Sequence, residues 1–166
     1  MKRKFKLLTS VASLCVAVAL MAFGVYAAAT PQVKLSGTVS FTANNVIADV
    51  IVKVDGAEHQ KVELIATSPE VNNVNEITIS LNESKLTSEI TIYVTSKQAD
   101  PINVEVTDNS AGDAVKLLTY NKVVGATTVD AGASEILVHT GTFTANLGTT
   151  KTGAAGSVDI TVALSK

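Results

Sequence analysis

The chain has 166 residues, with 13 basic and 15 acidic side chains and a formal charge of −2. Four of the basic side chains and the only cysteine, Cys15, fall within residues 1–29, so the remainder has nine basic and 15 acidic side chains, a formal charge of −6, and no arginine. This remainder excludes an arginine-rich surface for nucleic acid, disfavours binding to anionic membranes, and excludes disulfides and thiolate metal sites.

Residues 1–29 predict an export signal. Lys2, Arg3, Lys4 and Lys6 form a positive start, residues 7–29 carry no charge, and the segment ends in small residues of the kind that signal peptidase reads. We therefore predict a secreted protein that meets signal peptidase during export and has no membrane contact after cleavage. The apolar stretch is longer than usual for a signal, so a retained N-terminal anchor is the alternative.

Residues 30–45 form an N-terminal segment with strict alternation. In the strand expected over residues 33–41, one side carries only apolar side chains: Val33, Leu35, Val39 and Phe41. After cleavage this strand would be an exposed edge, whose unpaired backbone groups recruit other chains. We predict that it is donated to a neighbouring copy. Gly37 would lie where the receiving groove is narrowest, because a residue without Cβ permits close backbone approach.

Residues 46–166 predict one β-sandwich domain, because alternation with period 2 dominates and helical periodicity is scarce. Strands are expected over residues 46–54, 60–66, 77–81, 90–94, 102–106, 115–120, 135–139, 141–147 and 158–164. Turn signals such as Asp55-Gly56 separate them. The predicted fold class is all-β, an antiparallel sandwich with either a jelly-roll or an immunoglobulin-like topology. The Thr/Gly/Ala stretch over residues 148–156 is expected to be a loop.

The strand expected over residues 46–54 has apolar residues on both sides. Ile47 and Ile51 occupy the second side and are candidates for an interface between copies. The alternative is that a local loop covers them and that residues 33–41 form an ordinary edge strand of the protein's own sheet.

The sequence offers no catalytic or metal-binding constellation beyond residue 29. His59 and Glu63 share a strand face but lack a third ligand, so a solvated face is expected there. His139 is expected at the surface. Residues 108–113 place oxygen ligands at alternating positions without the terminal glutamate of a calcium loop, which favours an Asx turn. We predict no enzymatic activity, no cofactor and no metal.

The end of the export segment, residues 24–29, and the strand over residues 35–43 resemble the TasA/camelysin group of bacterial surface and biofilm-matrix proteins. The resemblance covers about the first 45 residues and the general alternating pattern. It implies a jelly-roll-like sandwich and assembly into extracellular fibres by strand donation. Camelysin-type proteins have also been called metallopeptidases, but this sequence has no zinc-protease motif, so that activity is not carried over. Chaperone-assembled pilins also begin with an alternating donor strand, although many carry paired cysteines that are absent here.

Two functions follow as expectations. The first is a secreted structural protein that assembles with itself, or with related surface proteins, as a fibre or lattice subunit by β-strand donation. The second is a monomeric secreted module that binds a carbohydrate or a protein. Tyr93, on the side opposite Ile90 and Ile92, is the aromatic side chain available for stacking on a sugar.

Overall fold

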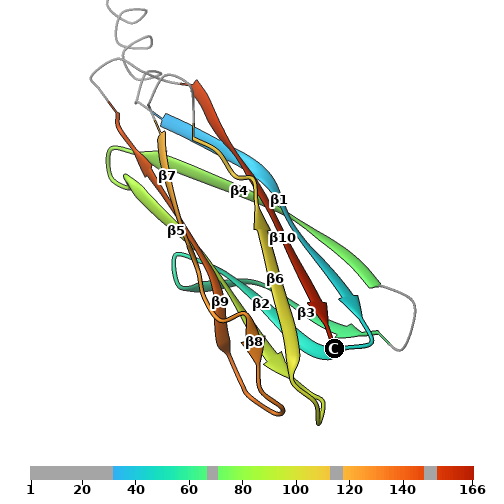
Figure 1. The fold of residues 1–166 in the computed structure, drawn as a ribbon. Helices are drawn as coiled ribbons and strands as arrows, with labels where there is room; N and C mark the ends of the chain where they lie inside the picture. The colour runs from blue at the N-terminus through green and yellow to red at the C-terminus, as the bar shows by residue number, and fades with distance from the viewer. Residues whose placement is uncertain (1–31, 67–70, 113–117, 148–152) are drawn as a thin grey trace, which may run out of the picture.

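The computed structural model describes residues 32–66, 71–112, 118–147 and 153–166, and these residues form strands and connections without a helix (Figure 1). The strands are β1 (Gln32–Asn44), β2 (Ile47–Val54), β3 (Ala57–Ile65), β4 (Val71–Asn82), β5 (Thr87–Ser96), β6 (Ile102–Asp108), β7 (Leu118–Val124), β8 (Thr128–Val129), β9 (Ile136–Ala145) and β10 (Gly153–Ser165). The predicted export signal over residues 1–29 and its cleavage site lie outside the described residues.

The strands form two five-stranded sheets, with the orders β4-β1-β10-β6-β8 and β3-β2-β5-β9-β7, here called sheet A and sheet B. Every ladder is antiparallel except the one between β1 and β10, which is parallel. Alternate apolar residues of both sheets are buried in one shared core. The all-β prediction is confirmed, and the two sheets are consistent with a β-sandwich.

The turn predicted at Asp55-Gly56 joins β2 to β3. Asp55 and Gly56 have positive φ values of 54° and 78°, as the tight turns that match the twist of a hairpin require. The Asp55 carboxylate also accepts hydrogen bonds from the Ser88 hydroxyl (2.9 Å) and the Glu89 amide (2.9 Å), and it pairs with the Lys85 ammonium. This turn therefore anchors the start of β5 as well.

Apart from shifts in strand ends, such as the earlier start of β4, the structure differs from the predicted elements in three places. The segments expected at residues 135–139 and 141–147 are one strand, β9, because Gly141 lies beneath the Tyr120 ring instead of in a turn. The two-residue β8 was not predicted, since it is too short to show periodicity. The loop expected over residues 148–156 is wrong from Gly153 onward, because Gly153 begins β10 by pairing with Val33.

The N-terminal strand is not the exposed edge that the sequence predicted. β1 lies inside sheet A, paired with β4 along Gln32–Ala43 and with β10 along Val33–Asn44. Figure 1 shows β1 running beside β10 towards the C-terminus. The structure therefore places residues 32–44 inside sheet A of one copy, between β4 and β10.

Gly37 is the point of closest approach between β1 and β10. A Cβ atom there would overlap the backbone carbonyl of Val158. We expect Gly37→Ala to force the two strands apart and to lower the free energy of unfolding by about 3 kcal/mol. Urea denaturation measures this, with Ser36→Ala on the exposed side as the control. Equal midpoints for the two variants would contradict the prediction.

Candidate functional site

The first candidate site is the position that β1 occupies, here called the β1 slot: the gap in sheet A between β4 and β10. The four apolar side chains predicted to face a groove, Val33, Leu35, Val39 and Phe41, all have 0% exposure. The groove they fill belongs to their own chain. Another copy can use the slot only if β1 has left it.

Ile47 and Ile51 differ in accessibility. Ile47 is 36% exposed at the start of β2, whereas Ile51 is only 5% exposed and is not available as an interface residue within one copy. No loop is needed to cover Ile51. Its register neighbours Lys61 and Tyr93 stand beside it on the outer face of sheet B. The Lys53 ammonium lies 4.6 Å from the centre of the Tyr93 ring, so this ring is not a free platform for a sugar.

An ion-pair network surrounds Asp49, which is 5% exposed on the same face. The Asp49 carboxylate lies 3.1 Å from the Lys61 ammonium and 2.7 Å from the Lys97 ammonium, and Lys97 also pairs with Glu63 at 2.8 Å. Burial opposes ionisation of Asp49, but the hydrogen bonds and charges of Lys97 and Lys61 outweigh it and lower the pKa of this carboxyl. Glu63, which the sequence placed on the same strand face as His59, therefore pairs with Lys97.

The second candidate site is a polar cluster between the sheets, here called the inter-sheet cluster: Asp108 of β6 with Tyr120, Lys122 and His139 of sheet B. One Asp108 carboxylate oxygen accepts a hydrogen bond from the Tyr120 hydroxyl and lies 2.9 Å from His139 Nε2. The Lys122 ammonium donates to the Asp108 backbone carbonyl at 2.6 Å. Sheet A and sheet B are thus joined by polar contacts at this point.

The prediction that His139 lies at the surface is wrong, because the residue has 0% exposure. His139 pairs with the inward-facing Ile92 across the β5–β9 ladder. The sequence carried a signal for this: counting back in steps of two from Ala145 and Phe143, both buried, leads through Gly141 to His139. Because one strand was predicted to end before Gly141 and another to begin there, this alternation was not followed as far as His139.

Within the cluster, burial favours the neutral forms of Tyr120 and His139. Burial, with a smaller contribution from Asp108, raises the pKa of Tyr120 far above its usual value. Burial also lowers the pKa of His139, against the opposing attraction of Asp108. His139 Nδ1 has no hydrogen-bond partner among the described residues. The side chains of Asp108 and His139 are 2% and 0% exposed, so a substrate cannot reach them. The cluster is a structural connection between the sheets.

The buried His139 predicts a loss of stability in mild acid. The unfolded chain takes up a proton as the pH falls through about 6.5, while folded His139 resists protonation, so the free energy of unfolding decreases. The pKa values of Asp49 and Asp55 are also lowered. The stability that these two ionised carboxylates give to the fold is lost only below about pH 4. Urea midpoints at pH 7.5 and 5.5 measure the effect. His139→Gln should flatten it, whereas a variant of the exposed His59, His59→Gln, should retain it; the reverse pattern would disprove the assignment.

The contacts of two further candidate sites, the His59–Glu63 pair and residues 108–113, show how their side chains are used. His59 is exposed, and its Nε2 lies 3.2 Å from the Glu76 backbone carbonyl, away from any metal arrangement with Glu63. The Asx turn is confirmed, since the Ser110 amide donates to Asp108 Oδ1 at 2.8 Å. Asp113, at the end of that segment, lies outside the described residues. Within those residues no group of three His, Cys, Asp or Glu side chains is placed to hold a metal ion.

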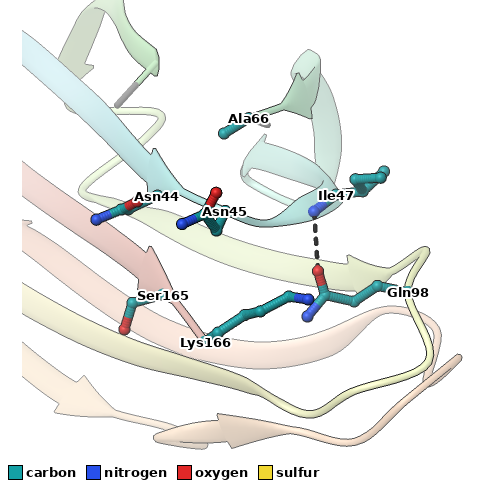
Figure 2. Close-up of a pocket in the computed structure, with 7 residues that line it drawn as sticks. All are labelled: Asn44, Asn45, Ile47, Ala66, Gln98, Ser165 and Lys166. Atoms are coloured by element: carbon teal, nitrogen blue, oxygen red, sulfur yellow. Dashed lines mark hydrogen bonds between the residues drawn. The ribbon is translucent and has the colours of Figure 1, made fainter. Parts of the chain in front are cut away.

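A pocket of about 520 Å³ opens at the end of the sandwich where β1 stops (Figure 2). Its lining comes from the ends of several strands and is mostly polar: Asn44, Asn45, Ile47, Ala66, Gln98, Ser165 and Lys166. The Ile47 amide donates to Gln98 Oε1 at 3.1 Å. The pocket therefore marks the end at which β1, β2 and the C-terminus meet.

No protein-family model and no curated protein matches this chain. Among the described residues there is also no helix of sufficient length and hydropathy to cross a membrane.

Proposed function

We propose that the protein is a secreted structural subunit that assembles with copies of itself, as a fibre or lattice on the cell surface or in the extracellular matrix, by exchange of β1. The observation that supports this function is the position of β1. β1 is the first strand after the predicted export segment, yet it lies inside sheet A, between the edge strand β4 and β10.

Removing β1 would leave the rest of the fold incomplete in a specific way. β4 and β10 would face each other with unpaired backbone groups, and the buried partners of Leu35 and Phe41 would be open to water. Only an extended segment with the same alternation and a residue without Cβ at the position of Gly37 fits this gap. A second copy carries such a segment.

The finer topology that we propose is jelly-roll-like. From β3 to β10 every consecutive strand changes sheet, and only β2 and β3 follow each other within one sheet. An immunoglobulin-like sandwich keeps several consecutive pairs in the same sheet. The alternation between sheets favours the double-sheet jelly roll, in agreement with the resemblance of the N-terminal segment.

The test is the state of assembly of purified residues 30–166 over a range of concentrations. Filaments or defined oligomers in electron microscopy and size-exclusion chromatography are expected at high concentration. A protein that elutes as a monomer at every concentration, and forms no filaments, would overturn the proposal.

The pocket favours the second function, a monomeric binding module. Three amide side chains, Asn44, Asn45 and Gln98, line it, and amides pair well with sugar hydroxyls. A monomer that binds glycans, and loses binding on Gln98→Ala, would support this function instead.

A further inference from the structure

We infer that exchange of β1 is reciprocal: two copies each place β1 in the other's slot and meet at the end of the sandwich where the pocket lies. This inference rests on the proposed exchange of β1. It adds the partner, a second copy of this chain, and the surface through which the pair forms.

The first argument is the length of the connection that follows β1. Asn44 ends β1 and Ile47 begins β2, so the connection spans at most about 11 Å. Val46 is 0% exposed, and its carbonyl accepts a hydrogen bond from the Ala66 amide at 3.0 Å. Only Asn45 is left to change direction. If β1 enters the slot of another copy, the two copies must therefore touch near Asn45.

The second argument is that each copy gives and receives β1 at the same end. β1 runs parallel to β10, so any strand in the slot leaves it beside Ser165 and the C-terminal Lys166. β2 starts at this end too, where the Lys97 amide donates to the Ile47 carbonyl at 3.0 Å. Figure 2 shows Asn45, Ile47 and Lys166 around the same pocket. In a two-fold pair, each copy donates its β1 and accepts its partner's β1 through one interface. In an open chain, two different neighbours would have to contact the same end of every copy.

The third argument concerns what favours opening at this end. Asn45 has a φ of 52°, in the left-handed region, which asparagine adopts more readily than most residues but less favourably than glycine. A short connection under strain promotes strand exchange, because the exchanged form extends it. Ile47 and Ile65 are register partners at this end and are 36% and 58% exposed. Contact across the two-fold axis would cover this apolar pair.

In a fibre or lattice built from such pairs, exchange of β1 joins the two copies of each repeating unit, and a second surface joins one unit to the next.

The experiment uses a double variant, Ser40→Cys with Val74→Cys, in a full-length chain whose single cysteine is replaced by Cys15→Ser. Ser40 and Val74 are register partners in β1 and β4. The protein is unfolded, refolded at high concentration and oxidised, and its species are separated on a non-reducing gel. A reciprocal pair gives a single covalent dimer with no free thiols.

The other outcomes identify what fails. A ladder of higher species would overturn the two-fold closure and leave strand exchange intact. A covalent monomer at every concentration would overturn exchange itself, and with it the proposed function. The pair Ser40→Cys with Lys61→Cys is the control, because Lys61 lies on sheet B and should give no β1-specific dimer.

Two hinge variants test the strain at Asn45 by sedimentation. Asn45→Gly should weaken the dimer by about tenfold, since glycine removes the cost of the closed connection. Asn45→Pro should strengthen the dimer, because proline cannot adopt a positive φ. Glu135→Gly is the matched control, as Glu135 has a φ of 49° far from the connection in sequence and should leave the equilibrium unchanged. Equal effects of Asn45→Gly and Glu135→Gly would overturn the role of the hinge.

Discussion

Replacing Phe41 with aspartate is expected to unfold the protein. Phe41 is among the largest side chains without exposed surface, and it lies in β1 between Asn73 of β4 and Val162 of β10. Loss of the buried ring alone costs about 3–5 kcal/mol, and the new carboxylate has no cationic partner there. Together, the lost ring and the buried carboxylate approach the whole free energy of unfolding of a domain of this size, about 5–15 kcal/mol. The cooperative thermal transition seen by circular dichroism should disappear.

Thr42→Asp is the control for that variant. Thr42 is the next residue of β1, faces the outer side of sheet A and is partly exposed, so the charge should remain hydrated and the transition should survive. A normal unfolding midpoint for Phe41→Asp would show that β1 does not contribute to the core of its own chain.

The Phe41→Asp variant also tests whether the β1 slot binds a strand from another molecule. Because the damage is confined to β1, a synthetic peptide with the wild-type sequence of residues 32–44 should restore the transition of Phe41→Asp and of Leu35→Asp. Because Leu35 and Phe41 are fully buried, the fold of one copy and the proposed assembly depend on the same side chains.

The sequence predicted which side chains of β1 are buried but not where the strand lies. Alternation with period 2 is the same for an edge strand and for a strand inside a sheet. The partners of β1 are β4 and β10, and β10 begins more than 100 residues further along the chain. Nothing local to residues 33–41 specifies those partners. The close packing around Gly37 arises from the same distant pairing.

The inter-sheet cluster was missed for a related reason. A histidine or an aspartate at a strand end is ordinarily solvated, and only the register of β9 against β5 turns His139 inward. Asp108 lies at the end of β6 in the other sheet, so its contact with His139 depends on how the two sheets pack. The buried Asp49 was hidden in the same way, because its lysine partners lie in β3 and directly after the end of β5.

Asp108→Ala should be the most damaging substitution outside the apolar core. It leaves the Tyr120 hydroxyl without its acceptor and removes the carboxylate beside His139. The Ser110 amide also loses its hydrogen bond. Removing one partner from such a buried cluster costs about 3–5 kcal/mol, because the remaining polar groups stay desolvated. Urea denaturation should show this loss, whereas a variant of the exposed Asp159 of β10, Asp159→Ala, should stay close to wild type.

A mutant cycle separates the coupling from a simple loss of packing. If Asp108, Tyr120 and His139 act as a unit, Tyr120→Phe should cost clearly less in the background of Asp108→Ala than in the wild-type chain, because its hydroxyl no longer has a partner to lose. Replacement of His139 by leucine should likewise cost less in the background of Asp108→Ala, because the imidazole has already lost the Asp108 carboxylate there. The coupling free energy should be about 1–2 kcal/mol for each pair. Additive effects across the cycle would show that the sheets are joined by the surrounding apolar packing alone, and that the short contacts at Asp108 add nothing to stability.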